Sequence, residues 1–396
     1  MSPPAAPRRR SLRGGARRDR RDRALARRAR VAGDGRRRPA DRRGARVAGA
    51  RDQGAHAGSA RAPRRPRAGR DAGGAAVARV GRERAPLAGA ALVARRAVKG
   101  TRRFEALLVR GLAAGLERMP WPRALRVGAD LGDAARRLGI RRRVAEDNLR
   151  IAFPDASRAA RAAVLTAHYR ELGRVAAEYP RLAALAQASD GEVVARATGL
   201  EHLEAARRGG RGAILVTGHY GHFELLGAWL GGRHPVDFVV QPLSNPAVED
   251  LLAGWRMDAG VGAIPIGAGV RRVFEALRAN RWVALVADQD ARSHGVFVPF
   301  YGRLSSTPKG PAELALRTRA PLLMGFAHRL PDGRHEIVMK PPLEPRDRRA
   351  PGAVEALTAC HTALLEAEIR RHPEAWFWLH RRWKTTPPTE PARGGT

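Results

Sequence analysis

Short apolar runs recur along residues 212–340 and have the length of buried strands. They read "GAILVTG" (212–218), "VDFVVQ" (236–241), "GAIPIG" (262–267), "WVALVAD" (282–288), "PLLMGFA" (321–327) and "EIVMK" (336–340). Between most of them lie segments with helical spacing of apolar residues, such as "NPAVEDLLAGWRM" and "VRRVFEALRAN". Strands that alternate with helices are typical of α/β folds. We therefore predict a mostly parallel central sheet flanked by helices, in a core that spans residues 191–390.

The segment before this core has a helical pattern. In "RFEALLVRGLAAGLERMPW" the apolar side chains recur at helical spacing, at Leu107, Leu108, Leu112 and Leu116. Similar patterns continue to about residue 185, so residues 101–190 are predicted to form a helical, membrane-associating lead-in. The first helix is too short and too charged to span a bilayer, which needs about 20 apolar residues. Two alternatives stay open for it: it lies in a membrane interface, or it packs on the domain as an ordinary amphipathic helix.

Residues 1–100 have no sustained apolar period. They carry 30 of the 74 Lys and Arg residues and only 7 of the 38 Asp and Glu residues, and every aromatic residue lies beyond them. Such a segment cannot bury enough surface to offset the entropy of ordering. We predict a disordered Arg-rich segment, or upstream sequence translated from a wrongly chosen start. The functional alternative is an arm that binds nucleic acid or anionic lipid.

Several kinds of chemistry lack their sequence signature in this chain. The single cysteine, Cys360, excludes an intramolecular disulfide and favours a reducing compartment. No Walker A pattern and no G-x-G-x-x-G after a strand is present, so nucleotide use is not indicated. The G-x-S-x-G turn of a nucleophilic serine is also absent. No apolar segment follows the basic start, as a secretory signal would require. A base that activates a substrate hydroxyl directly is the simplest chemistry that remains.

A candidate for that base lies at the end of the first predicted strand of this series. The stretch "VTGHYGHFELLG" (216–227) places His219, His222 and Glu224 within six residues. His219 and His222 could bind one metal ion, whereas a pair of His219 and Glu224 could act as an oriented general base. That pair can meet only if His219 lies in the turn before the helix. The third alternative is a histidine with a purely structural role.

The motif and four further blocks resemble the lipid A biosynthesis (lauroyl/myristoyl) acyltransferase family, which has an H-x4-D/E motif of the glycerolipid acyltransferase type. The further blocks are "NLRIAFP" (148–154), "QPLSNP" (241–246), "ADQDARSHGVFVPFYGRLSSTPKGPAELALRTRAPLL" (287–323) and "HPEAWFWLHRRWK" (372–384). They follow in order over about residues 101–386. The last two blocks are much more specific than H-x4-E alone.

The resemblance implies an enzyme that transfers a fatty acyl chain from an acyl carrier protein or coenzyme A thioester to a hydroxyl of a lipid A precursor. It implies the cytoplasmic face of the cell inner membrane as the location, a phospholipid surface as a partner, and neither a cofactor nor a metal. His219 would be the general base and Glu224 would orient it. The resemblance further assigns substrate binding to Asp288, Asp290, Arg303, Gln241 and Asn245.

Two departures from the family pattern qualify this expectation. Gln241 stands where the family commonly has an arginine, so an anion contact is lost or comes from a neighbour such as Arg256. The usual hydrophobic anchor is interrupted by charges over residues 85–118, which favours peripheral attachment through basic residues and a weakly apolar helix.

Two other functions remain as alternatives at this point. A phosphatidylinositol-mannoside or other glycolipid acyltransferase shares the same motifs. A basic nucleic-acid-binding protein would account only for the Arg-rich segment. Nucleic-acid modules usually combine their charge with aromatic residues or a fold, and residues 1–100 have neither, so no nucleic-acid partner is expected.

Overall fold

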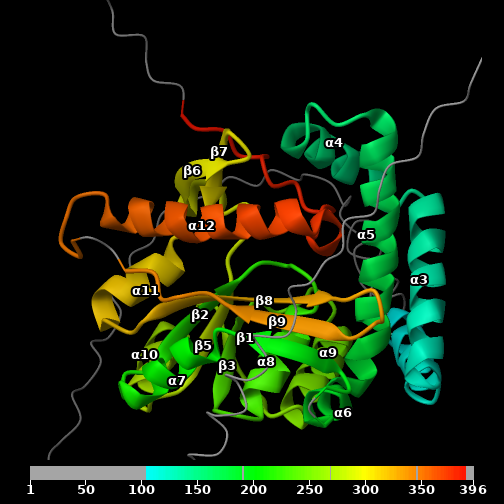
Figure 1. Cartoon of the computed structure of the whole chain (residues 1–396), viewed down its shortest axis with the longest axis horizontal. Helices are drawn as coiled ribbons and strands as arrows, with labels where there is room; N and C mark the ends of the chain where they lie inside the picture. Colours follow the sequence, from blue (N-terminus) through cyan, green and yellow to red (C-terminus); the bar gives the residue numbers. More distant parts are fainter. Residues whose placement is uncertain (1–103, 190, 268, 345–346, 389–396) are drawn as a thin grey trace, which may run out of the picture. The chain divides into compact units, whose positions relative to one another are not determined.

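A computed structural model describes residues 104–388 except 190, 268, 345 and 346 (Figure 1). The predictions for residues 1–100, together with the basic side chains at 102 and 103, lie outside the described residues. The first described helix covers residues 104–117. It is followed by α3 (Trp121–Arg137), α4 (Arg142–Ala152), α5 (Arg158–Glu178), η1 (Tyr179–Arg181) and α6 (Leu182–Gln187).

The strands and helices then alternate as the apolar runs predict. The strands are β1 (Val194–Thr198), β2 (Ala213–Thr217), β3 (Val236–Val240), β4 (Val261–Pro265), β5 (Trp282–Val286), β6 (Val296–Phe300), β7 (Arg303–Thr307), β8 (Leu322–Arg329) and β9 (His335–Met339). The helices among and after them are α7 (Leu200–Arg208), α8 (Phe223–Gly231), α9 (Pro246–Asp258), α10 (Val270–Arg278), η2 (Arg292–His294), α11 (Gly310–Thr318), α12 (Ala353–Arg371) and η3 (Pro373–Ala375).

Seven strands form one sheet in the order β1-β9-β8-β2-β5-β3-β4. All of its neighbouring pairs are parallel except β8 and β9, which are antiparallel. The prediction of a mostly parallel central sheet is therefore confirmed. β6 and β7 form a separate antiparallel hairpin, which the sequence analysis missed because its two strands lie within a motif block and have no helix between them.

Helices cover both faces of the sheet, with α11 and α12 on one side and α6, α7 and α8 on the other (Figure 1). Alternate residues of β2 enter the two cores: Ile214 and Val216 pack with α12, and Ala213 and Leu215 pack with α7 and α8. This period of two is the geometry of a strand that is buried on both faces. It explains why "GAILV" contains no polar residue.

The helices before β1 pack on the same core. Ser157 begins α5, where its side-chain oxygen accepts a hydrogen bond from the backbone N–H of Ala160 at 3.1 Å. α5 and α3 contact each other closely through Gly173 and Gly128, since a Cβ atom at Gly128 would lie only 2.4 Å from the Gly173 carbonyl oxygen. Larger side chains at this contact would push the two helices apart.

Candidate active site

A tight turn joins β2 to α8 and presents His219. The turn begins after Thr217, and α8 begins at Phe223. Gly221 has a φ of 53°, and a Cβ atom there would lie 1.7 Å from the carbonyl oxygen of Ala327, so only glycine fits. His219 therefore lies in the turn before the helix, as the sequence analysis required for a histidine–carboxylate pair.

The carboxylate that holds His219 comes from the neighbouring strand. Asp288 follows β5, which pairs in parallel with β2, so both residues lie at the carboxyl edge of the sheet. Asp288 Oδ1 lies 2.7 Å from Nδ1 of His219, and Asp288 Oδ2 accepts the backbone N–H of His219 at 2.8 Å. The indole N–H of Trp376 donates to the same Oδ2 at 2.7 Å. Three contacts thus fix a carboxylate that is 3% exposed.

This environment sets the protonation behaviour of the pair. Burial disfavours the charged imidazole, but the Asp288 carboxylate outweighs burial and raises the pKa of His219 above its ordinary value. Burial opposes the charged form of Asp288 as well, yet the charge and hydrogen bonds of His219 and the Trp376 N–H lower the pKa of Asp288. With Nδ1–H directed at Asp288, the Nε2 atom of His219 is left as the base.

The predicted contact between Glu224 and His219 is wrong. Glu224 lies in the first turn of α8 and is paired with Arg256 of α9, whose Nε lies 3.0 Å from both carboxylate oxygens. Asp288 occupies the place at Nδ1 that the sequence analysis gave to Glu224. The physical reason is that α8 directs Glu224 toward α9, while the in-register strand brings Asp288 beside the turn. Arg256 is therefore held by Glu224 beside α8.

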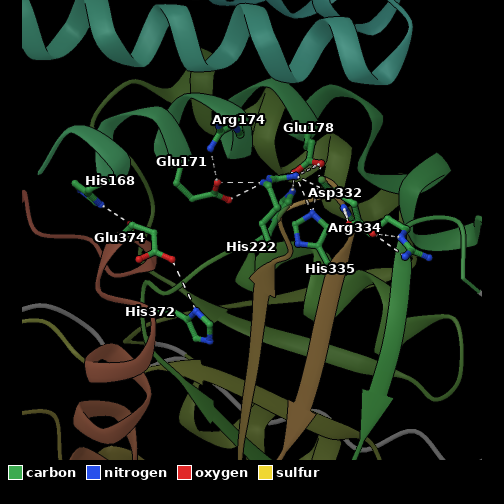
Figure 2. A network of polar contacts seen from close by, with 12 residues as sticks. His168, Glu171, Arg174, Glu178, His222, Asp332, Arg334, His335, His372 and Glu374 are labelled. Atoms are coloured by element: carbon green, nitrogen blue, oxygen red, sulfur yellow. Dashed lines mark hydrogen bonds and ion pairs between the residues drawn. The ribbon is translucent and has the colours of Figure 1, made fainter. Parts of the chain in front are cut away.

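His222 has a structural position in the same turn. Its Nδ1 atom accepts the backbone N–H of Leu225 at 3.2 Å and so caps α8. Its Nε2 atom lies 3.6 Å from Glu178, within the polar network of Figure 2. Burial lowers the pKa of His222 to about 3, so the ring is neutral. His219 and His222 face different carboxylates, and the arrangement does not support a metal ion shared between them.

A network of polar contacts around Glu178 surrounds the His222 side chain of this turn (Figure 2). Arg329 of β8 binds two carboxylates of α5, Glu171 at 2.9 Å and Glu178 at 2.6 Å. His335 and the indole N–H of Trp121 also contact Glu178, at 3.4 and 2.8 Å. Burial opposes the charge of Glu178, but Arg329 outweighs it and holds the pKa of Glu178 well below its ordinary value. The sequence analysis found none of these partners, because they come from four separate elements.

An apolar cavity of about 650 Å³ opens beside His219. It runs between the helix of residues 104–117, α3, α5 and α9, and its lining is almost entirely carbon, including Leu112, Leu116, Leu172 and Trp255. Phe223 and Phe377 form aromatic walls around the His219 ring, at centroid distances of 5.4 and 6.1 Å. The His219 side chain is 31% exposed, so a bound molecule can reach it. Cavities of this size and character hold apolar ligands.

The other predicted site residues have different surroundings. Asp290 Oδ2 accepts a hydrogen bond from Thr385 at 2.9 Å, and its backbone N–H donates to His380 at 3.0 Å. Asn245 caps α9 and donates to Glu105 at 2.8 Å. Gln241 is exposed after β3, and Arg303 is exposed at the β6–β7 hairpin. Of the predicted substrate-binding residues, only Asp288 contacts His219.

The sequence analysis gave no role to Trp376, Phe377 or Gln289, which also surround His219. The backbone N–H of Phe377 donates to the carbonyl oxygen of His219 at 2.9 Å. The Gln289 amide nitrogen lies 3.4 Å from Nε2 of His219. The sequence did contain a signal for these residues, because "WFWLH" and "ADQD" belong to the two most specific family blocks. However, no local spacing links them to the motif at His219.

Comparison with known proteins identifies the family of this chain. The sequence model of the bacterial lipid A biosynthesis acyltransferase family matches residues 94–385. The chain belongs to this family. It is 29% identical over 285 residues to the lipid A biosynthesis lauroyltransferase of Escherichia coli, an alignment that covers 69% of this chain and 90% of that protein. It is 28% identical over 275 residues to the palmitoleoyltransferase of the same organism, covering 68% of this chain and 87% of that protein.

Other relatives carry a different name. The phosphatidylinositol mannoside acyltransferase of Mycobacterium tuberculosis is 34% identical over 191 residues, which are 47% of this chain and 58% of that protein. The corresponding protein of Mycolicibacterium smegmatis is 30% identical over 189 residues, which are 46% of this chain and 60% of that protein. The chain thus spans somewhat over half the length of these mannoside acyltransferases. The names of the two groups refer to different lipids, lipid A in one and phosphatidylinositol mannoside in the other.

Proposed function

We propose that this member of the family transfers a fatty acyl chain from an acyl thioester to a hydroxyl of a lipid A precursor. The observation that carries the proposal is that His219 lines the 650 Å³ apolar cavity. An acyl chain in that cavity would bring its thioester carbonyl next to the base. Asp288 would hold the imidazole and stabilise its charged form.

The chemistry follows from the two ring nitrogens of His219. Nε2 removes the proton of the acceptor hydroxyl as the oxygen attacks the thioester carbonyl carbon. The resulting tetrahedral intermediate collapses with cleavage of the C–S bond, and the departing sulfur takes the proton back from the imidazolium. Because the proton returns to the leaving group, the step needs neither a cofactor nor a covalent intermediate. The Gln289 amide, 3.4 Å from Nε2, is positioned to donate to an oxygen that develops charge there.

The direct test is a transfer assay with the purified full chain. Acyl carrier protein and coenzyme A thioesters would be offered in parallel with a lipid A precursor, and products identified by mass spectrometry. We expect one acyl group to be added per acceptor, and no product with His219→Ala. Formation of free fatty acid alone, with no acylated lipid, would contradict the proposal.

A membrane surface is the proposed partner, at the cytoplasmic face of the inner membrane. Several apolar side chains of the helix of residues 104–117, of α3 and of the turn after α3 are more than 40% exposed: Phe104, Leu107, Leu108, Leu112, Leu131, Leu138 and Ile140. Leu112, Leu131 and Ile140 also line the cavity, so the cavity opens onto this apolar face. Exposed Arg110 and Arg141 lie on the same segments, where they would attract anionic headgroups. Among the helices described, none is long and apolar enough to span a bilayer.

A mannosylated phosphatidylinositol, or another glycolipid, is the second candidate acceptor. The mycobacterial mannoside acyltransferases favour it, because they are 34% and 30% identical over 191 and 189 residues, against 29% over 285 residues for the lauroyltransferase. Both acceptors offered in competition would separate the two candidates, because only one should be acylated efficiently.

The Arg-rich segment bears on the non-enzyme alternative, a basic nucleic-acid-binding protein. Deletion of residues 1–100 should leave transfer activity intact if the enzyme is formed by the rest of the chain. A full chain without transfer activity, whose nucleic-acid binding is lost on this deletion, would favour the alternative.

A further inference from the structure

A second cluster of histidine and carboxylate side chains lies outside the proposed active site. His328 of β8, Glu368 of α12 and His372 at the end of α12 each offer one ligand atom, and these atoms lie within 4.8 Å of one another. The sequence separates His328 from the other two by at least 40 residues, so no local spacing reveals the group. His328 and Glu368 are 5% and 3% exposed.

We propose that His328, Glu368 and His372 bind a zinc ion that fixes the end of α12 to β8. Two imidazoles and one carboxylate form a ligand set that suits Zn²⁺, with a fourth position for water. This proposal does not depend on the acyl transfer proposed above.

The hydrogen bonding of His328 leaves one ring nitrogen for a metal. Its Nε2 atom faces Glu336 of β9 at 3.2 Å, in a directly paired cross-strand position. Its Nδ1 atom is buried without a hydrogen-bond partner among the described residues. A metal-binding histidine typically donates its second nitrogen to a carboxylate, which fixes the tautomer. Glu336 is itself held by Arg196 of β1 at 2.6 Å.

The His372 ring also has one nitrogen near a carboxylate and the other left for a metal. Its Nδ1 atom lies 3.8 Å from Glu374, as Figure 2 shows, which leaves Nε2 for a metal. The two imidazole rings stack at a centroid distance of 4.1 Å, so the His372 ring must turn out of the stack before both rings can direct a nitrogen at one ion. Glu368 contributes charge. Its ion pairs with Lys340 and Arg371 both use Oε2, so Oε1 is the oxygen for the metal.

The distances between the three ligand atoms would suit a zinc ion once the atoms move closer together. A tetrahedral zinc with bonds of about 2.0–2.2 Å holds its ligand atoms about 3.3 Å apart, so the widest pair must approach by at most about 1.5 Å. His372 can supply this movement, because its side chain is 36% exposed at the end of a helix.

The position of the cluster gives the ion a structural role. The chain continues from His372 through η3 to Trp376 and Phe377, which hold Asp288 and the backbone of His219. Tyr220, adjacent to His219, has a buried hydroxyl with no partner among the described residues. An ion at this cluster would hold the segment of Trp376 and Phe377 in place, and with it one wall of the proposed active site.

The test measures zinc directly in the untagged full chain. After removal of bound metal with a chelator, zinc chloride is titrated and read by thermal unfolding and by metal analysis after gel filtration. We expect one zinc per chain and a Tm higher by about 5 °C at saturating zinc. His372→Ala and Glu368→Gln should abolish both effects. His202→Ala, which changes a histidine of α7 outside the cluster, should leave both unchanged.

A further variant keeps the proposal testable if the ligand variants fail to fold. Glu336→Gln keeps all three ligands but removes the carboxylate behind His328, and should weaken zinc affinity by about 10- to 100-fold. Equal zinc content in the unaltered protein and His372→Ala, or a Tm that zinc does not change, would overturn the proposal. An unchanged affinity in Glu336→Gln would contradict the assignment of Nδ1 of His328.

Discussion

Asp288 and His219 are separated by 69 residues in the sequence, yet a carboxylate oxygen of one lies 2.7 Å from Nδ1 of the other. The parallel pairing of β2 with β5 brings them together, and Trp376 fixes the carboxylate from the far end of the chain. Because Glu224 is bound to Arg256 instead, Asp288 is the group that sets the pKa and orientation of His219.

Asp288→Asn should lower kcat by about 10²-fold or more, because the imidazole loses its orienting carboxylate. It should also shift the pH profile. The negative charge of Asp288 favours the imidazolium, so its removal lowers the pKa of His219. The acid limb of the profile, expected above pH 6.5 in the unaltered enzyme, should therefore move to lower pH. A pH–rate profile of both proteins measures this, with Asp290→Asn as the control that keeps the limb in place.

Substitution of His219 and substitution of His222 should have different effects on activity and stability. His219→Ala should abolish transfer while thermal unfolding stays nearly unchanged. His222→Ala should lower Tm, because α8 loses its cap and Glu178 loses a neighbour, and should reduce kcat far less. Equal loss of activity in both variants, combined with inhibition by a chelator, would instead support a metal ion at the turn.

Glu224→Gln tests whether this residue acts through structure. The substitution leaves Arg256, whose side chain is 13% exposed, without its buried carboxylate partner, so the free energy of unfolding should fall by about 1–3 kcal/mol. The acid limb of the pH profile should move much less than in Asp288→Asn, since Glu224 is the smallest contributor to the pKa of His219. A shift as large as that of Asp288→Asn would show that Glu224 controls the base.

Arg329→Met should destabilise the fold by about 3–5 kcal/mol at neutral pH, because it leaves Glu171 and Glu178 buried without their cation. The unaltered protein holds the pKa of Glu178 below 4.5, so this stabilisation is present above that pH and is lost as the pH falls toward the lower, folded-state pKa. The difference between the two proteins should therefore shrink in acid. Urea unfolding at pH 7 and pH 4 measures it.

A surface pair provides the control for that experiment. Arg334 pairs with Asp332, and both side chains are more than 40% exposed. Arg334→Met should change the free energy of unfolding by less than about 1 kcal/mol. A similar loss in both variants would mean that burial of the network contributes little.

Charged substitutions on the exposed apolar face test whether this face binds the membrane. Leu107→Glu with Leu108→Glu should weaken sedimentation with anionic vesicles and slow turnover of vesicle-embedded acceptor, because two carboxylates would meet the headgroups. Leu304→Glu is a matched control, since Leu304 is 50% exposed but lies on β7, away from this face. Unchanged vesicle binding in the double variant would place the membrane contact elsewhere.

The sequence alone determined the layer architecture, because alternation of apolar runs and helical spacing is a local property of the chain. It located six of the seven strands of the central sheet and placed His219 at the end of a strand. It also indicated the family, since the ordered blocks survive as sequence. The missed sheet strand, β1, has only one buried residue among its five, so its apolar signal is weak.

Only the tertiary structure decided which carboxylate holds His219. The nearest acid in the sequence, Glu224, is carried by α8 toward Arg256, whereas Asp288 arrives through the register of two strands. The same reason explains the buried partners of Glu178 and the cluster of His328, Glu368 and His372. Spacing along a chain fixes contacts within one element, but contacts between elements depend on how strands pair and helices pack.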